Sequence, residues 1–458
     1  MKKISILLAM GLLLGILPGC GTGNETPAIP TSDNTTPTPT PEATTPEGTT
    51  PEETTPAPST PAEPKSFHLE IGDPVVVTQG AVGDDAWGHN QFPGLSYTLD
   101  GNIVATWCYS SDTIDDYVDV YRSKVSTDGG KTWSSDESLC SISNKFKMSN
   151  GKYFAGFERA NAHEATWQKA YEPGYTWSTR DGDYKLYFAE DLPKNEDNTV
   201  WGYEYDAKTD TKEKFECTIN WPHAVLTEFP GEKIYPMTQM FALSQDSIII
   251  VDGVMYLAMY FYGFNSASPT QEYAVGDFSK YYSTFIFSSE DNGRTWNFLS
   301  QFLPLAGIKF SEGLCEPTLN VMPDGSIMIL MRSGGNSYPC YWSRSTNKCK
   351  SWSTIRKFDD IGVLPQMVTL DCGVSIATYG RPYMRIRATS DPTGKKWQSA
   401  QTFDLASGEN NSSCYYTDLL ALDDTHALWI YSDFKYPNAD GVPVKSIITR
   451  VITVVFDE

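Results

Sequence analysis

One structural unit recurs along this chain: an apolar run rich in β-branched and aromatic residues, a tight acidic turn, and a second run of the same kind. Three of the turns are Asp-Gly, at 100–101, 252–253 and 324–325, and two looser copies lie at 371–373 and 423–424. Asp-Gly between such runs is a strong hairpin signal because glycine adopts positive φ without steric cost. Beyond the N-terminal leader no apolar stripe has a helical period, so the chain is predicted to be all-β.

A second motif follows four of these hairpins. Residues 126–133, Ser-Thr-Asp-Gly-Gly-Lys-Thr-Trp, have the pattern S-x-D-x-G-x-T-W, and residues 289–296 repeat it in full. Residues 345–352 and 390–397 hold degraded copies. In this pattern the Ser and Asp side chains form hydrogen bonds with nearby backbone N–H groups, glycine supplies the left-handed turn, and Trp packs between sheets. The motif resembles the Asp box of sialidase-like β-propellers, a structural turn that carries no chemistry.

The resemblance implies a six-bladed β-propeller of sialidase type over residues 66–458. Five hairpins are visible. The stretch 134–245 is rich in Trp, Tyr and charge, and it is predicted to hold the sixth blade together with an inserted loop region. The alternating run 446–456 is predicted to pair with 74–79 and so close the ring.

The first 65 residues differ from the rest in composition. Lys2 and Lys3 precede an apolar run, 4–17, which is too short to span a bilayer and has the form of a signal-peptide core. The following Pro-Gly-Cys20 completes a segment that resembles the lipobox of bacterial lipoproteins. The resemblance implies a signal peptide at 1–19 and a diacylglyceryl group on Cys20; the alternative is an ordinary secretory peptide.

Residues 20–65 are mostly Thr, Pro, Glu and Ala. Such a segment buries too little apolar surface to offset the entropy cost of folding, so it is predicted to be a disordered, extended stalk. The implied protein is anchored to the membrane through its lipid alone, and the stalk presents the folded part on the bacterial cell surface.

Charge and cysteine spacing exclude several other classes. With 35 Lys and Arg against 57 Asp and Glu, the net charge is −22, which argues against a nucleic-acid partner. The eight cysteines besides Cys20 form no CxxC pair, and the five histidines show no metal spacing. We predict no metal and no cofactor; disulfides and buried free thiols both stay open as states of the cysteines.

The segment 311–332 is the best candidate for chemistry. Glu316 stands before an Asp-Gly turn, and Arg332 ends the run that follows the turn. This resembles the sialidase segment in which a Glu helps a tyrosine to attack and an Arg belongs to a triad that holds the substrate carboxylate. The alternative for both residues is a structural ion pair.

Two further segments complete this resemblance. Residues 414–420, Cys-Tyr-Tyr-Thr-Asp-Leu-Leu, resemble the family's Tyr-x-x-Leu segment and imply that Tyr416 is the nucleophile. Tyr-Gly-Arg381-Pro resembles the setting of the last triad arginine, with Arg385 and Arg387 as nearby rivals. A neutral phenol avoids the repulsion that a carboxylate nucleophile would meet at an anomeric carbon bearing a carboxylate. Tyr416 could instead be a core aromatic.

A general acid is also required for the leaving oxygen. The loop after the first hairpin, where the family keeps its acid, contains Asp112, Asp115 and Asp116. Asp115 is the preferred acid, because neighbouring carboxylates raise one another's pKa. The alternative is that these acidic residues belong to a solvated turn or are calcium ligands.

One position departs from the family pattern. Sialidases begin the first blade with Arg-Ile-Pro, whose Arg leads the triad, whereas this chain has Gln91-Phe-Pro. Gln91 still donates hydrogen bonds but has no charge, and losing one charge-assisted bond weakens carboxylate binding by about 1.5–3 kcal/mol. Arg122 or Arg159 could replace the missing cation, or the substrate is a different sugar.

The sequence therefore predicts an exo-glycosidase acting on a glycan, most simply an exo-α-sialidase that retains configuration through a tyrosine nucleophile. Two alternatives are a glycosidase of the same superfamily acting on another sugar and a non-catalytic propeller that binds glycans. Substrate-binding roles are implied for Arg332, Arg381 and Gln91.

Overall fold

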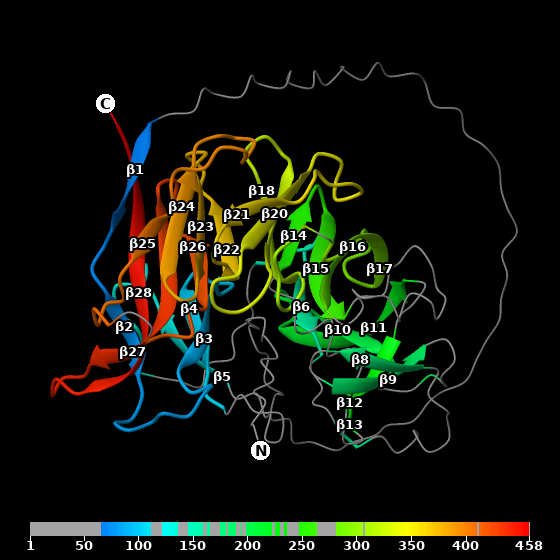
Figure 1. Ribbon diagram of the computed structural model, residues 1–458, viewed down its shortest axis with the longest axis horizontal. Helices are drawn as coiled ribbons and strands as arrows, with labels where there is room; N and C mark the ends of the chain where they lie inside the picture. Colours follow the sequence, from blue (N-terminus) through cyan, green and yellow to red (C-terminus); the bar gives the residue numbers. More distant parts are fainter. Residues whose placement is uncertain are drawn as a thin grey trace, which may run out of the picture. The chain divides into compact units, whose positions relative to one another are not determined.

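Strands and turns make up the part of the chain that the structure, a computed structural model, describes (Figure 1). The described residues are 66–110, 121–135, 145–158, 163–164, 175–179, 182–188, 194, 198–221, 225–229, 233–235, 247–262, 281–305, 307–409 and 412–457. Within them there is no α-helix, and accordingly no helix that could cross a membrane. The predicted signal peptide, Cys20 and the predicted stalk lie outside these residues.

Three sheets are plain antiparallel meanders in chain order. The first has β3 (Gln91–Tyr97), β4 (Ile103–Cys108) and β5 (Tyr121–Ser126). The second has β18 (Cys315–Val321), β19 (Ile327–Arg332), β20 (Cys340–Ser345) and β21 (Arg356–Asp359). The third has β22 (Val363–Thr369), β23 (Ser375–Gly380), β24 (Met384–Thr389) and β25 (Gln401–Phe403).

A fourth sheet joins the two ends of the folded part. It contains β26 (Thr417–Ala421), β27 (His426–Pro437) and β28 (Pro443–Phe456), with β1 (Phe67–Ile71) and β2 (Val75–Gln79) both paired to β28. The register runs from Val75 opposite Thr449 to Gln79 opposite Ser446. The predicted pairing of 446–456 with 74–79 is thus confirmed, and β1 extends it (Figure 1).

The remaining strands form two larger sheets. One has the order β14 (Ile248–Val251), β15 (Val254–Tyr262), β16 (Tyr282–Ser289), β17 (Thr295–Phe302), β11 (Thr211–Asn220), β10 (Val200–Asp206) and β6 (Tyr153–Phe157). The other has β7 (His163–Glu164), β13 (Lys233–Tyr235), β12 (Val225–Phe229), β9 (Gly182–Phe188) and β8 (Tyr175–Thr179). The described strands of 134–245 therefore divide between two sheets, and the count of six blades stays a prediction.

All five predicted hairpins are present. Their turns join β3 to β4, β14 to β15, β18 to β19, β22 to β23 and β26 to β27. Asp252 (φ 50°) and Gly253 (φ 74°) both have positive φ, as a two-residue turn of type I′ requires. The acidic-Gly signal is local, so it holds whatever surrounds the hairpin.

The S-x-D-x-G-x-T-W turns form the hydrogen bonds predicted for them. Ser126 Oγ donates to Asp128 Oδ1 over 2.7 Å, and the same Oγ accepts from Gly130 N over 2.8 Å. The turn at 289–296 repeats this with Ser289 and Gly293, again over 2.8 Å. The terminal Trp296 is fully buried among side chains of β6 and β16, so it packs between strands distant in sequence.

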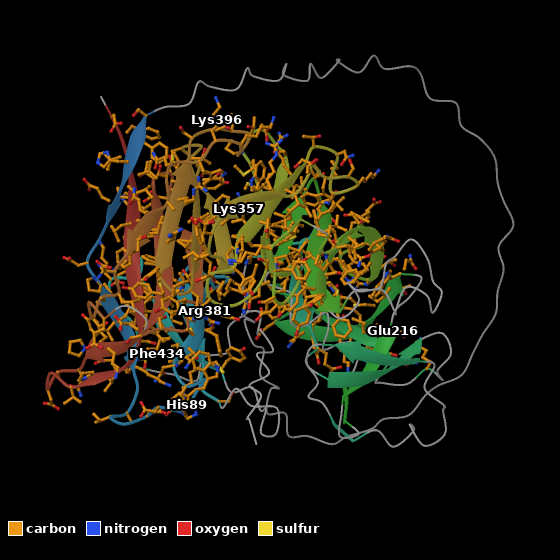
Figure 2. The ribbon with its side chains drawn as sticks, in the orientation of Figure 1. His89, Glu216, Lys357, Arg381, Lys396 and Phe434 are labelled. Atoms are coloured by element: carbon orange, nitrogen blue, oxygen red, sulfur yellow. The ribbon has the colours of Figure 1, made fainter. Side chains whose placement is uncertain are left out.

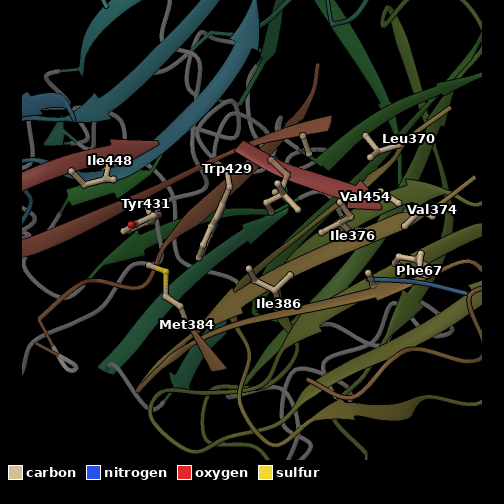
Figure 3. Close-up of a cluster of buried hydrophobic side chains, with 14 of the residues drawn as sticks. Phe67, Leu370, Val374, Ile376, Met384, Ile386, Trp429, Tyr431, Ile448 and Val454 are labelled. Carbon is tan, nitrogen blue, oxygen red and sulfur yellow. The ribbon is translucent and has the colours of Figure 1, made fainter. Parts of the chain in front are cut away.

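Neighbouring sheets pack through their first strands, except that β15, the second strand of its sheet, makes the main contact with β18. β15 contacts β18, β18 contacts β22, β22 contacts β26, and β26 contacts β3. Clusters of buried apolar side chains fill the space between consecutive sheets; Figure 3 shows the one between the sheets of β22–β25 and β26–β28. Antiparallel sheets packed in succession around their first strands are the blades of a β-propeller. This packing brings the starts of the first strands close together.

Candidate active site

Three of the predicted site residues meet in one hydrogen-bonded group. The Tyr416 hydroxyl donates a short hydrogen bond to Glu316 Oε1. Arg332 Nη1 donates to the same oxygen over 2.6 Å and lies 3.4 Å from the Tyr416 hydroxyl. Glu316 and Arg332 come from the neighbouring strands β18 and β19, whereas Tyr416 directly precedes β26. All three side chains are at least nine-tenths buried.

A β-bulge aims Glu316 toward this group. The β18–β19 register shifts between Cys315 and Thr318, and Glu316 has a φ of 42°. Matching bulges occur at Phe92 (φ 52°) and Leu364 (φ 38°), and all three residues precede a proline, which cannot donate to the ladder. The same local structure thus recurs in three sheets, and only in one does it carry an acid.

The second oxygen of Glu316 is also engaged. Glu316 Oε2 accepts a hydrogen bond of 2.8 Å from the backbone N–H of Leu364, which sits in the corresponding bulge of the next sheet. Because both oxygens are held, the carboxylate has a fixed orientation, with Oε1 toward the phenol. A base held in this way is ready to receive the phenolic proton.

Burial and charge keep the phenol protonated at rest. Burial raises the pKa of Tyr416 well above its usual value, and the negative charge of Glu316 raises it further. The nearby guanidinium groups of Arg332 and Arg381 oppose this shift but do not cancel it. The phenol is therefore neutral at neutral pH, and its proton is directed at Glu316.

Arg332 lies between two carboxylates. Besides Glu316, its Nη2 lies 2.8 Å from Glu312 Oε2, and its Nε donates to Gly334 O over 3.0 Å. These carboxylates hold the pKa of Arg332 well above its usual value, against the effect of burial. The contact with Glu312 lacks hydrogen-bond geometry, so Nη2 is buried without a hydrogen-bond acceptor.

Arg381 contributes a second cation at the end of β23. Its Nη2 donates to the backbone oxygen of Cys414 over 2.8 Å, and its charge acts on Tyr416. Figure 2 labels it in the middle of the molecule. No described carboxylate forms an ion pair with it. Its rivals are engaged elsewhere, because Arg385 pairs with Asp359 and Arg387 donates to backbone oxygens.

Gln91, the first residue of β3, is fully buried. Neither its Nε2 nor its Oε1 has a hydrogen-bond partner. The ring of the adjacent Phe92 packs against the Tyr416 ring with centroids 4.8 Å apart. Burying a polar group without a partner costs about 1–3 kcal/mol.

Other predicted residues fall elsewhere. The guanidinium carbon of Arg122 lies 3.4 Å from the centroid of the Tyr109 ring, and His89 stacks on the same ring at 4.7 Å (Figure 2 labels His89). Neither has a contact with Tyr416 among the interactions of the described residues. Asp112, Asp115, Asp116 and Arg159 lie outside the described residues, so the general acid stays a prediction.

Sequence reasoning missed two neighbours of the group. Glu312 was visible four residues before Glu316, but nothing in the sequence marks it as the second partner of Arg332. Tyr260, at the end of β15, is buried, and its pKa is raised well above its usual value by burial and then by the charge of Glu316. Its ring meets Tyr282 edge-on at 5.3 Å.

The described residues contain no disulfide and no group of side chains arranged to bind a metal ion. The seven described cysteines are free, and six of them are buried. No three His, Cys, Asp or Glu side chains in this part of the chain gather closely enough to hold a metal ion.

Comparison with known proteins gives distant similarities. No family model matches the sequence, and no curated protein matches it. Among solved structures, the α-L-arabinofuranosidase Arb93A of Fusarium graminearum is 14% identical with a TM-score of 0.43, covering 85% of this chain and 98% of that one. An α-L-arabinanase of Penicillium chrysogenum gives 11% and 0.43, with 83% and 98% covered.

A sialidase lies at the same distance. The NanB sialidase of Streptococcus pneumoniae is 12% identical with a TM-score of 0.44, covering 83% of this chain and 70% of that one. TM-scores of 0.43–0.44 are too low to assign a fold or a substrate to this chain. The architecture stated above therefore stands on the strand pairing and sheet contacts of this chain.

Proposed function

We propose that this chain is a retaining exo-glycosidase, in the first place an exo-α-sialidase, with Tyr416 as nucleophile and Glu316 as its base. The observation that carries the proposal is the buried hydrogen bond from the Tyr416 hydroxyl to Glu316, with Arg332 bridging both groups. A buried tyrosine hydroxyl needs only one hydrogen-bond acceptor. Here that acceptor is a carboxylate held by two further donors, Arg332 Nη1 and the backbone N–H of Leu364, and the residues involved come from three sheets.

The proposed reaction starts at this pair. As the phenolic oxygen attacks the anomeric carbon, its proton passes to Glu316 Oε1 and the bond to the leaving oxygen breaks. Arg332 and Arg381 stabilise negative charge that develops on the phenolic oxygen. An acid protonates the leaving oxygen and later removes a proton from water, which attacks the anomeric carbon; the bond to Tyr416 then breaks and the phenolate takes its proton back from Glu316. We assign the role of this acid to Asp115.

An anionic substrate suits the unpaired donors around the pair. Arg332 Nη2 and the Gln91 amide are buried without hydrogen-bond partners, and Arg381 has no ion pair with a described carboxylate. These are the three positions implied for holding a carboxylate. Guanidinium groups bind carboxylates well, so these donors favour an anionic substrate.

A neutral sugar is the second candidate. Glu312 and Glu316 already neutralise Arg332, and Gln91 adds no charge. The described side chains thus leave only Arg381 to balance a substrate carboxylate. An amide and a neutralised arginine are also suitable partners for sugar hydroxyl groups.

The test is hydrolysis of 4-methylumbelliferyl glycosides by the full chain and by Tyr416→Phe. Release from the α-sialoside, at least a hundredfold lower in Tyr416→Phe, would support the first proposal. Release from another glycoside, such as the α-L-arabinofuranoside, with the same dependence on Tyr416 would support the second. Release that is equal in both proteins would exclude the tyrosine mechanism, and no release from any glycoside would leave a glycan-binding propeller.

A further inference from the structure

A groove lined by cations and tryptophans lies away from the Tyr416 group. It has a volume of about 460 Å³, within the range of small-ligand sites. The lining side chains are Trp342, Arg344, Thr346, Ser351, Trp352, Ser353, Arg356 and Lys395. Three of these are cations and none is an acid, in a chain whose net charge is −22.

The strand register separates this groove from the proposed active site. On β20, Cys340 pairs with Arg332 of the active-site group, whereas Arg344 pairs with Met328. Four residues of extended chain span about 13 Å. Thr346, Ser351 and Trp352 follow in the turn at the far end of the strand, and Lys395 comes from the equivalent turn of the next sheet. The groove therefore lies at the end of the sheets opposite to Arg332.

Two of its cations have no anionic partner among the described residues. Arg344 pairs with Asp324 and donates to Ser326 Oγ over 2.8 Å, so its side chain is fixed. Arg356 and Lys395 are exposed and form no ion pair with a described residue. Figure 2 labels their sequence neighbours Lys357 and Lys396. Unpaired cations on a strongly acidic chain are open to an anionic ligand.

The other lining groups narrow the ligand class. Trp352 is half-buried and gives the groove one aromatic wall, and its indole N–H donates a hydrogen bond of 2.9 Å to Ser300 Oγ. Trp342 is 9% exposed and belongs to a buried apolar cluster, so it presents little of its ring to the groove. The exposed Thr346 side chain adds a hydroxyl group. Aromatic walls pack against the apolar faces of sugar rings, hydroxyl groups bond to sugar hydroxyls, and guanidinium groups bind carboxylate or sulfate.

We propose that this groove is a second carbohydrate site, which binds an anionic sugar unit through Arg356 and Lys395 and holds its ring against Trp352. The anion is a carboxylate or a sulfate, since both offer oxygens to the same donors. A nucleic acid is disfavoured because its many phosphates would meet the overall negative charge of the chain. Binding at this site does not depend on the mechanism proposed for Tyr416, so the two proposals can be tested separately.

The test measures binding of trigalacturonic acid to the full chain by calorimetry, with sulfated galactotriose as the arm that distinguishes the anion. Arg356→Ala/Lys395→Ala should weaken binding by about tenfold or more, because two charge-assisted bonds are lost. Lys208→Ala, which removes an exposed cation elsewhere, is the matched control and should bind normally. Turnover at the active site should be unchanged in both variants.

Several results would overturn the proposal. The first is equal affinity of the double variant and of Lys208→Ala for trigalacturonic acid. The second is that the native chain binds neutral galactotriose as tightly as trigalacturonic acid. The third is tighter binding of inorganic sulfate or of a dinucleotide than of either anionic sugar. The first would place the binding elsewhere, and the others would remove the requirement for an anionic sugar.

Discussion

At the residue scale, Glu316 and Glu312 hold the same arginine but differ in what else they touch. Glu316 accepts a hydrogen bond from the Tyr416 hydroxyl, whereas Glu312 lies against the Nη2 nitrogen of the guanidinium group. The two carboxylates therefore have separable roles, one toward the nucleophile and one toward the charge of Arg332.

Substitution should separate these roles. Glu316→Gln keeps the shape but loses the base, so kcat should fall by about a hundred- to ten-thousandfold. Glu312→Gln leaves the base intact and frees positive charge on Arg332, so KM for an anionic glycoside should fall while kcat changes little. Steady-state kinetics on the released phenol checks both, and a larger loss of kcat in Glu312→Gln than in Glu316→Gln would reverse the assignment.

Buried tyrosines also predict the response to alkaline pH. Burial raises the pKa of Tyr431 to about 12, even though Arg450 Nε donates to its hydroxyl over 2.9 Å. The folded pKa lies above that of an unfolded tyrosine, so the stabilising effect is complete below about pH 10 and is lost as the pH rises toward 12.

Thermal unfolding between pH 9 and 11.5 measures this effect. The native chain should lose up to about 1.4 kcal/mol of unfolding free energy per pH unit from this group above pH 10. Tyr431→Phe should begin less stable, having lost a hydrogen bond, but should show a shallower decline. Parallel declines would mean that Tyr431 does not differ in pKa between the folded and unfolded states.

At the element scale, the glycines of two kinds of turn differ in what surrounds them. Gly325, in the β18–β19 hairpin, has a φ of 79° and open space where a Cβ would stand. Gly293, in the turn between β16 and β17, has a φ of 84°, and a Cβ there would lie 2.9 Å from the ring of Phe154 on β6. Both positions favour glycine because of their positive φ, but only at Gly293 would a side chain also clash with a neighbouring strand.

A pair of alanine substitutions tests this distinction. Gly325→Ala should cost about 1–2 kcal/mol from the left-handed backbone alone. Gly293→Ala adds the clash with a buried ring and should cost about 1–3 kcal/mol more. Urea unfolding followed by tryptophan fluorescence gives both values; equal costs would show that the Phe154 ring moves aside freely.

The elements were largely predictable because their signals are local. The five hairpins follow from acidic-Gly turns, and the turns near Trp133 and Trp296 follow from Ser and Asp side chains bonding to backbone within four residues. The division of 134–245 was not predictable. There β11 pairs in parallel with β17, whose partner residues are more than 70 positions away.

At the scale of the whole molecule, the chain combines a blade assembly with an N-terminal segment of quite different composition. The proposed attachment rests on that segment, in which Cys20 follows a short apolar run. We propose that lipid on Cys20 links the protein to the membrane, because this cysteine follows the apolar run directly after Pro-Gly.

Removal of this thiol should change location but not catalysis. In a bacterial host, Cys20→Ala should move the protein from the membrane fraction to the soluble fraction and abolish incorporation of labelled palmitate. Activity per molecule should stay the same, because the folded part is unaltered. Unchanged membrane association and labelling would contradict the anchor.

The sequence alone predicted the five hairpins and their turns, because each depends on residue patterns within a few positions. The alternating pattern of 446–456 also predicted its pairing with 74–79, although the two segments lie far apart in the chain. The sequence also named Tyr416, Glu316 and Arg332. Their contact was decided only by the tertiary structure, since Tyr416 and Glu316 are 100 positions apart and meet because first strands of successive sheets pack together. The segment before β18 gave Arg332 its second carboxylate, and burial left the Gln91 amide unpaired, because burial and pairing depend on neighbours that no local pattern specifies.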